Sequence, residues 1–195
     1  GRAGWDLACW VTALAWVKYR IHAMYGLLPL FDTRAARALD ARATALSGGD
    51  GYALMQRAGQ AAWQCLLEYW PEAQRIMVVC GPGNNGGDGY VLARLAHRSG
   101  RAVSVLHLAE HVPASELAQR ACTDYLGVGG RIELFPDALP QGDVVVDALF
   151  GLGLSRAPDA FATALIDAIN AHPGPVLALD VPSGLDADMG SAPGK

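Results

Sequence analysis

Apolar and polar residues follow two different periods along this chain, and the two periods predict alternating helices and strands. From Asp32 to Trp70 apolar residues recur every three or four positions, which predicts two helices, at 33–46 and 51–70. Beyond Trp70, short apolar runs typical of buried strands alternate with helical segments. The expected strands are 76–80, 103–108, 132–135, 144–147 and 176–181, and the expected helices between them are 90–99, 115–126 and 160–170.

Both N-terminal helices carry an apolar face that should pack inward. The expected inward positions are Ala35, Ala36, Leu39 and Ala43 in the first helix, and Leu54, Ala58, Ala62, Leu66 and Tyr69 in the second. Gly59 lies inside the second helix, where glycine costs roughly 1 kcal/mol relative to alanine. A close backbone contact would explain this glycine. Gly100 is placed to end the helix expected at 90–99.

Strands that are apolar on both faces and alternate with helices predict an α/β fold. In such folds a mostly parallel sheet is covered by helices on both sides. The chain contains no repeat, linker or low-complexity segment that would divide it. We therefore expect one domain, over residues 24–195.

The two ends of the chain depart from this pattern. The apolar run at 7–17 has about half of the ~20 residues needed to cross a bilayer, and a signal peptide is poorly supported because Arg2 is the only positive charge ahead of it. We interpret residues 1–23 as an extension of unclear status, either sequence upstream of a start at Met24 or an extra helix. Because the sequence stops soon after a strand and loop, we expect the domain to be truncated at its C-terminus.

Composition excludes several classes of protein. The chain is 52% hydrophobic and 17% charged, as in a globular domain with a large core, and its net charge of −4 argues against nucleic-acid binding. The cysteines are Cys9, Cys65, Cys80 and Cys122, and no two have the C-x-x-C spacing of a zinc site. They fit reduced, buried thiols, so we expect a cytoplasmic protein that does not enter a membrane.

Three loops that follow strands contain the residues best suited to ligand binding or catalysis. The first, 81–89, contains five glycines and two asparagines before a helical pattern begins, and it does not match a Walker loop. Glycine backbone and a helix N-terminus together make a cradle for an anion such as phosphate. The others are 147–156 and 180–186. In a parallel sheet these loops meet in one crevice beyond the carboxyl ends of the strands.

The charged residues in these loops allow structural or functional roles. Asp88 is by default a helix N-cap. Asp147 could bond backbone amides or meet a cation or sugar hydroxyl, and these alternatives are equally supported. Asp180 has the same ambiguity, although the Pro-Ser-Gly after it favours function. Arg156, beside two glycines, is a reasonable phosphate contact. No role is assigned to any histidine.

Read together, the three loops resemble the YjeF N-terminal domain family, whose enzymatic members are NAD(P)H-hydrate epimerases. The motifs that carry the resemblance are Gly-Asn-Asn-Gly-Gly-Asp-Gly at 83–89, Val-Asp-Ala-Leu-Phe-Gly-Leu-Gly at 146–153, and Leu-Asp-Val-Pro-Ser-Gly-Leu-Asp at 179–186. A fourth, Leu-Met-Gln-Arg-Ala-Gly at 54–59, is similar to the helix motif of the family. The resemblance extends over 31–190. Leu152 departs mildly, because many members have threonine there.

The resemblance implies a Rossmann-like three-layer α/β/α sandwich and a set of ligand-binding residues. It implies a potassium ion held by Asn85, Asp147 and Ser183, whose oxygens suit a hard cation. The implied substrate-binding residues are Asn84, Asn85, Gly86, Gly87, Asp88, Gly151, Leu152, Gly153, Leu154, Ser155, Arg156, Ala157 and Asp180. A homodimer is also implied, as is a fused or partner ADP- or ATP-dependent hydrate dehydratase.

The implied reaction is epimerisation of the R and S forms of hydrated NADH or NADPH at ring carbon 6, with Asp180 as the candidate for proton transfer. One alternative is a non-catalytic interaction and dimerisation scaffold, against which the intact Asn85, Asp147, Asp180 and Ser183 argue. A lipoprotein-binding role is neither supported nor excluded. A dehydrogenase would need an acidic residue about 20 positions after its glycine motif, and residues 89–109 contain no Asp or Glu.

Overall fold

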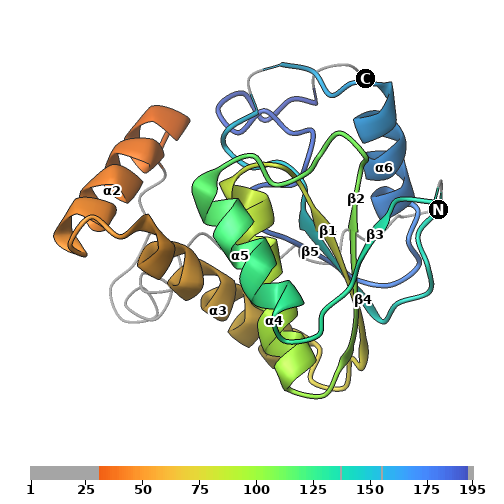
Figure 1. Ribbon diagram of the computed structural model, residues 1–195. Coiled ribbons are helices and arrows are strands. Elements are labelled where there is room, and N and C mark those ends of the chain that lie inside the picture. The colour runs from red at the N-terminus through yellow and green to blue at the C-terminus, as the bar shows by residue number, and fades with distance from the viewer. Residues whose placement is uncertain (1–30, 137, 155, 193–195) are drawn as a thin grey trace.

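The computed structural model describes residues 31–136, 138–154 and 156–192, and within them five parallel strands form one sheet (Figure 1). The strand order is β3-β2-β1-β4-β5, with every neighbouring pair parallel. The strands are β1 (Arg75–Cys80), β2 (Ala102–His107), β3 (Ile132–Leu134), β4 (Val144–Ala148) and β5 (Val176–Ala178). The predicted parallel α/β sheet is confirmed. Its crossover point lies between β1 and β4, where ligand crevices form in such sheets.

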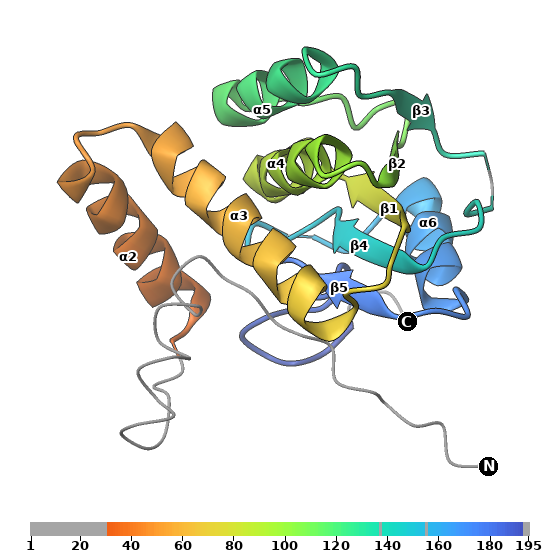
Figure 2. The same ribbon diagram turned by 90° about the horizontal axis from the view of Figure 1, so that it is seen from below.

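Helices cover both faces of this sheet, as the view from below shows (Figure 2). The helices are α2 (Thr33–Leu46), α3 (Gly51–Tyr69), α4 (Asn84–Arg98), α5 (Glu116–Leu126) and α6 (Ala160–Asn170). Residues of α3, α4 and α5 share one buried cluster with the sheet, and residues of α6 belong to a second cluster on the opposite face. The three-layer α/β/α arrangement is therefore confirmed.

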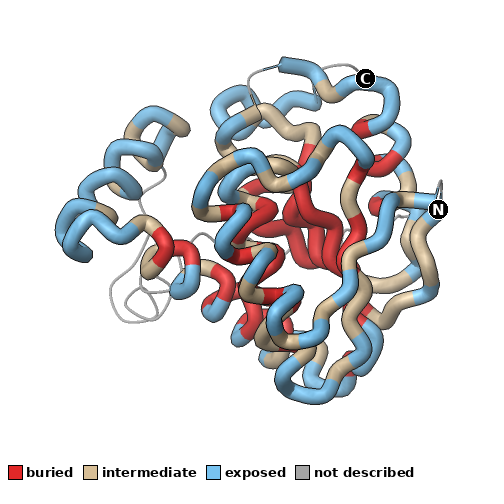
Figure 3. The backbone as a smooth tube through the Cα atoms, in the orientation of Figure 1, coloured by how far each residue is buried: buried red, intermediate tan, exposed pale blue. Residues whose placement is uncertain are grey.

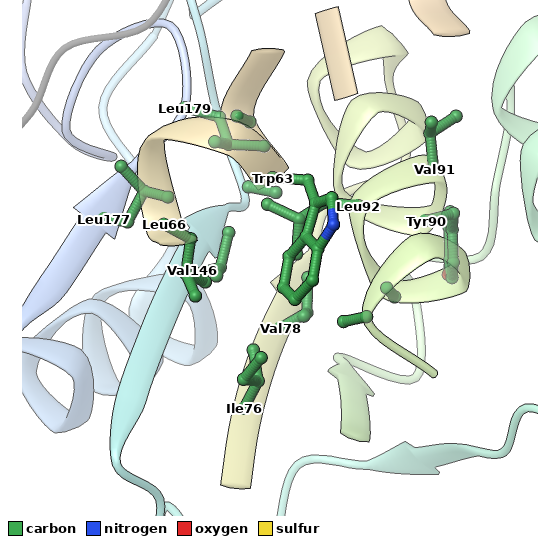
Figure 4. Packing of buried hydrophobic residues seen from close by; sticks show 14 of the residues in the cluster. Trp63, Leu66, Ile76, Val78, Tyr90, Val91, Leu92, Val146, Leu177 and Leu179 are labelled. Atoms are coloured by element: carbon green, nitrogen blue, oxygen red, sulfur yellow. The ribbon is translucent and has the colours of Figure 1, made fainter. Parts of the chain in front are cut away.

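The alternation along β1 explains why its sequence is apolar throughout. Ile76 and Val78 face the first cluster, whereas Met77 and Val79 face the second. In the first cluster Trp63 of α3 packs among side chains of β1, β4 and α4 (Figure 4). A strand buried on both faces needs no polar positions, so the run at 76–80 carries no period of two.

The boundaries of two elements and the exposure of one residue differ clearly from prediction. Helix α4 begins at Asn84 and not at residue 90, so the Asn-Asn-Gly-Gly-Asp-Gly run forms its first turns instead of a preceding loop. Asparagine and glycine are poor helix formers, and here tertiary packing overrides that preference. Strand β5 ends at Ala178, short of the predicted residue 181. Tyr69, predicted to face inward on α3, is 50% exposed.

Helix α2 does not pack into the core as predicted. None of its residues is buried, and Figure 3 shows it as exposed and intermediate positions only. Its contacts are polar and reach two loops at the carboxyl edge of the sheet. The N–H and hydroxyl of Thr33 donate to Asp188 at 2.8 and 2.7 Å, and Arg37 donates to the carbonyl of Leu152 at 2.7 Å.

The predicted end of α4 is confirmed, whereas the predicted N-terminal extension at 1–23 lies outside the described residues. Gly100 follows the C-cap of α4 with φ +86°, and the bonds from Gly100 to His97 and from Arg101 to Ala96 form a Schellman motif, as expected. Among the helices that are described, none is long and apolar enough to cross a membrane.

Gly59 sits where α3 crosses α4, and a side chain there would collide with α4. A Cβ would lie 2.5 Å from Cβ of Val91 and 2.9 Å from the carbonyl oxygen of Asp88. We predict that Gly59→Ala lowers the free energy of unfolding by about 1–3 kcal/mol, because overpacking outweighs the roughly 1 kcal/mol gained in helix propensity. Urea denaturation measures this change.

The exposed neighbour Gln60 supplies the control. Gln60→Ala should change stability by no more than about 0.5 kcal/mol. Val91→Ala should cost less in the Gly59→Ala background than in the wild type, since it removes the atoms that collide. Equal costs in the two backgrounds would contradict the explanation.

Candidate functional site

The first turn of α4 is held against the ends of β1 and β4 by direct backbone contact. A Cβ on Gly86 would lie 1.9 Å from the carbonyl oxygen of Gly81, and a Cβ on Gly81 would lie 1.8 Å from that of Leu149. Any side chain at these two positions would force the segments apart. The glycines therefore let three stretches of backbone meet at the crossover point of the sheet.

This helix begins with N–H groups that no side chain caps. The N-cap is Gly83, and the first backbone bond closes from the N–H of Gly87 to the carbonyl of Gly83 at 3.1 Å. The preceding N–H groups, on Asn84, Asn85 and Gly86, point out of the helix end, where the dipole is positive. The arrangement suits an anion, as the sequence predicted.

Asp147, at the end of β4, is a buried carboxylate that receives several hydrogen bonds. Its Oδ1 accepts from the hydroxyl of Ser183 at 2.6 Å and from the N–H of Leu149 at 3.2 Å, and its Oδ2 accepts from the N–H of Ser183 at 2.8 Å. The hydroxyl of Ser183 in turn accepts from the N–H of Phe150 at 2.8 Å. The bonds to backbone amides, one of the two roles that the sequence left open for Asp147, are therefore observed.

The pKa of Asp147 reflects two opposed effects. Burial raises the pKa, since a carboxylate loses its hydration, while the donors from Ser183 and Leu149 lower it. No lysine or arginine pairs with Asp147 among the ion pairs of the described chain. A carboxylate in this environment would be favoured by a nearby cation.

Asn85 provides a further unsatisfied group near the start of α4. Its Oδ1 and Nδ2 are both inaccessible to solvent and have no hydrogen-bond partner within the described residues. Buried amides without partners are costly, and each one calls for an explanation such as an ion or water. The described residues contain no cluster of three or more His, Cys, Asp or Glu side chains that could hold a metal. A cation here would instead need mixed amide, carboxylate and hydroxyl oxygens, which are hard ligands.

Asp180, two residues after the end of β5, has an unusual backbone conformation. It has φ +65°, a region rarely used by residues other than glycine, and its Oδ2 accepts from the N–H of Leu152 at 2.6 Å. A Cβ on Gly151 would lie 2.2 Å from that same Oδ2, so the carboxylate lies directly over Gly151. Burial raises the pKa of Asp180, and the Leu152 N–H and the charge of Arg37 oppose the rise.

Asp88 is not the helix N-cap that the sequence analysis took as its default role. It is the fifth residue of α4, because the helix begins earlier than predicted. Burial raises its pKa well above the usual range, and the negative charges of Asp180 and Asp40 add to the effect. Asp40 belongs to α2, so carboxyl groups from α2, α4 and the end of β5 influence one another across the crevice.

The remaining predicted residues lie on the loop after β4. The N–H of Leu154 donates to the carbonyl of Gly151 at 3.1 Å, which closes a turn. Gly153, Arg156 and Ala157 are exposed, and a Cβ on Gly153 would meet nothing within 4 Å. Ser155 lies outside the described residues. The structure thus joins the backbone of this loop to Asp180, while Arg156 stays at the surface.

Sequence reasoning missed the loop at 108–115, which follows β2 and reaches the same crevice. The hydroxyl of Ser115 donates to Oδ1 of Asn84 at 2.7 Å, and the ring of His111 lies edge-on to that of Phe150, with centroids 5.6 Å apart. Burial lowers the pKa of His111. The loop has few glycines and carboxylates, so its composition did not indicate a ligand-binding role. Its position after the strand next to β1 was the available clue.

Comparison with known proteins agrees with this geometry. Residues 51–195 match the family described as YjeF-related protein N-terminus. The chain belongs to this family. The resemblance inferred from the three loop motifs is therefore confirmed, and the matched YjeF segment begins with α3 and includes every residue of the candidate site.

Individual relatives in the YjeF family include single-activity and bifunctional proteins. The chain is 46% identical over 144 residues to the bifunctional NAD(P)H-hydrate repair enzyme Nnr of Escherichia coli K12, covering 73% of this chain and 28% of that protein. It is 40% identical over 162 residues to the NAD(P)H-hydrate epimerase of Rhodobacter capsulatus, covering 78% of this chain and 75% of that protein. The chain thus spans less than a third of the bifunctional relative.

A solved structure has the same fold. The chain matches the crystal structure of yeast ynu0 with a TM-score of 0.70 and 22% sequence identity, covering 83% of this chain and 74% of that one. At this level of identity the match concerns the fold alone, and it confirms the Rossmann-like architecture.

The bonds of Ser183 lead to a prediction about stability. We expect Ser183→Ala to lower the free energy of unfolding by about 2–3 kcal/mol, since it removes a donor to a buried carboxylate and leaves the Phe150 N–H without its acceptor. The loss should be complete at pH 8. It should shrink as the pH falls through the raised pKa of Asp147, because a protonated carboxyl depends less on that donor.

Urea denaturation at pH 8 and pH 5 measures both parts of this prediction. Ser47→Ala is the control, because Ser47 is exposed and should change stability by no more than about 0.5 kcal/mol. A loss that is independent of pH would mean that Asp147 is not the group through which Ser183 acts.

Proposed function

We propose that this chain catalyses epimerisation of the R and S forms of hydrated NADH and NADPH at ring carbon 6. The observation that carries the proposal is the convergence of an uncapped helix N-terminus, a hydrogen-bonded Asp147–Ser183 pair and a half-buried Asp180 at one crossover point. The proposal is supported by the names of relatives such as the Rhodobacter capsulatus NAD(P)H-hydrate epimerase.

The chemistry of the substrate sets what the site must do. Carbon 6 of the hydrated ring carries a hydroxyl and also bonds the ring nitrogen. Protonation lets the hydroxyl leave as water while the nitrogen lone pair fills in, and the planar cation then takes up water on either face. Ring opening and closure would reach the same product. Either route needs a positioned proton donor and acceptor, typically worth about 10²–10⁴-fold in rate.

Asp180 suits the proton transfer. The Leu152 N–H bond and the strained backbone fix its carboxyl over Gly151. Its raised pKa keeps more of the carboxyl protonated near neutral pH than an exposed aspartate would be. After donating its proton it carries a negative charge, which stabilises the ring cation electrostatically.

The dinucleotide phosphates fit the start of α4. The N–H groups of Asn84 to Gly86 form the anion-binding end, and the backbone of Gly151 and Leu152, in the loop after β4, lies against Asp180. Arg156 is exposed on that loop and is the candidate contact for the extra phosphate of NADPH. The proposed substrate-binding set is the one that the resemblance implies, with its phosphate end at α4.

A potassium ion fits beside Asp147. Asn85 has buried polar atoms without partners, and Asp147 is a buried carboxylate without a basic neighbour. Asn85, Asp147 and Ser183 would hold the ion, which when bound would supply positive charge that orders the loops and the phosphates. Asp147 itself holds the loop after β5 in place through Ser183.

The assembly in the cell is also part of the proposal. We place the protein in the cytoplasm as a homodimer acting with a hydrate dehydratase that uses ADP or ATP, either fused to it or as a partner. The match to a bifunctional repair enzyme in Escherichia coli supports a link to a second activity.

The central prediction concerns the exchange of epimers. The wild-type protein in potassium buffer should accelerate conversion of the R hydrate of NADPH to the S form. Chromatography measures the two forms over time, with a protein-free sample as the reference. Asp180→Asn should fold normally and lose about 10²–10⁴-fold in rate. The wild-type rate should also decline as the pH rises through the raised pKa of Asp180, since only the protonated carboxyl can donate.

Glu68→Gln is the control for the loss of a carboxylate, because Glu68 is exposed on α3 and distant from the loops at the carboxyl edge. It should retain the full rate. A folded Asp180→Asn variant with undiminished rate would remove Asp180 from the proton transfer, whereas lost binding with normal turnover would make it an anchor. A wild-type protein without any acceleration would favour the scaffold alternative.

Potassium binding has a readout independent of activity. The melting temperature of the wild type should rise when potassium replaces sodium, because a ligand that binds only the folded state stabilises it by about 2.7 kcal/mol at a hundredfold excess over Kd. Asp147→Asn should abolish the rise. Asp143→Asn, at the opposite end of β4, should lower stability through its lost pairing with Arg75 but keep the response to potassium. Loss of the response in both variants would refute the site.

A further inference from the structure

Ser115 has two hydrogen bonds that join helix α5 to the start of α4. As the N-cap of α5, its Oγ accepts from the N–H of Ala118 at 3.1 Å. The same hydroxyl donates to Oδ1 of Asn84 at 2.7 Å. One side chain thus caps a helix and also contacts the first residue of another helix.

The two bonds determine which end of the Asn84 amide faces Ser115. A hydroxyl has a single proton, and the Asn84 carbonyl oxygen is its acceptor here. If the amide were turned round, its NH₂ would donate to Oγ, and the hydroxyl proton would have no acceptor among the hydrogen bonds of the described residues. The observed orientation satisfies both groups and leaves Nδ2 of Asn84 without a bond inside the described chain.

The loop that carries Ser115 is anchored close to that contact. The N–H of Ala114 donates to the carbonyl of Pro82 at 2.8 Å. Together with the bond from Ser115 to Asn84, this gives two hydrogen bonds between the loop at 108–115 and the segment that begins α4. The edge-on contact between His111 and Phe150 adds a third attachment, to the loop after β4. These contacts fix the backbone position of Ser115, and with it the position of the hydroxyl that bonds to Asn84.

We propose that Ser115 is a positioning residue that turns the NH₂ of Asn84 toward a phosphate oxygen of the dinucleotide bound at the start of α4. Asn84 is the exposed first residue of this helix, so its NH₂ adds a donor to the unpaired N–H groups beside it. With the amide reversed, its carbonyl oxygen would face the phosphate and repel it. The identity of the ligand rests on the proposed function, whereas the orientation of Asn84 rests on the contacts of Ser115.

The expected kinetic signature is a change in KM with little change in kcat. A phosphate contact lies away from the reacting ring and stabilises the bound substrate and the transition state equally. Losing the orientation of one donor should raise KM by about three- to tenfold, the size expected for a single net hydrogen bond.

Three substitutions at Ser115 separate this role from capping. Ser115→Thr keeps the hydroxyl and should preserve the wild-type KM. Ser115→Ala removes both the helix N-cap and the hydrogen-bond donor to Asn84. Ser115→Gly also removes the donor, but glycine is a better N-cap than alanine and lowers helix stability by only a few tenths of a kcal/mol relative to serine. If orientation of Asn84 matters, the Ala and Gly variants raise KM equally and differ only in stability. If capping alone matters, KM follows stability and Gly resembles the wild type.

Two further comparisons complete the experiment. Asp50→Ala removes the N-cap of α3, whose bond to Tyr52 N–H is 2.9 Å, and should lower stability without raising KM. In an Asn84→Ala background, Ser115→Gly should have no additional effect on KM. An additive effect in that double variant would overturn the proposal, because Ser115 would then act independently of Asn84.

Binding measured by calorimetry with NADP⁺ as the probe distinguishes this proposal from the proposed function. If the wild type binds NADP⁺ and Ser115→Gly weakens binding severalfold, the role of Ser115 stands even when no epimer exchange is observed. If epimer exchange occurs and Ser115→Gly changes neither KM nor the Kd for NADP⁺, the proposed function stands and the role of Ser115 is refuted. A wild type that neither binds NADP⁺ nor exchanges epimers overturns both.

Discussion

The site depends on backbone segments that approach each other without any side chain between them. Gly81 and Gly86 lie where a Cβ would be less than 2 Å from a carbonyl oxygen, so the end of β1, the first turn of α4 and the loop after β4 occupy one small volume. This contact brings the helix N-terminus to the crossover point of the sheet. It also explains why a segment of poor helix formers is helical, because burial of Gly86 and Gly87 offsets their weak propensity.

Around this contact the protein gathers carboxyl groups whose burial is energetically unfavourable by itself. Asp147 is buried without a basic partner among the described ion pairs, and burial together with the charge of Asp180 raises the pKa of Asp88. Burying such groups costs stability unless donors or a cation compensate. The structure compensates partly, through the N–H groups of Ser183, Leu149 and Leu152. The part of this cost that the N–H groups do not offset would be offset when ligands bind to the site.

The sequence predicted the sheet well because its strands are buried on both faces and read as apolar runs. It also located Asp147, Asp180 and Ser183 at one edge, since the carboxyl ends of parallel strands meet there. It failed where tertiary packing overrides local preference. The helical start at Asn84 and the resulting position of Asp88 depend on contacts with Gly81, which lies outside the helix.

A second kind of failure concerns residues whose partners are distant in sequence. The apolar positions of α2 predicted an inward face, but the helix is held by polar bonds from Thr33 and Arg37 to loops after β5 and β4. The contact from Ser115 to Asn84 likewise joins segments with no common motif. In both cases a helix outside the glycine motifs bonds to a segment that carries one of them. The geometry of the crevice therefore depends on contacts made by residues outside the three motifs.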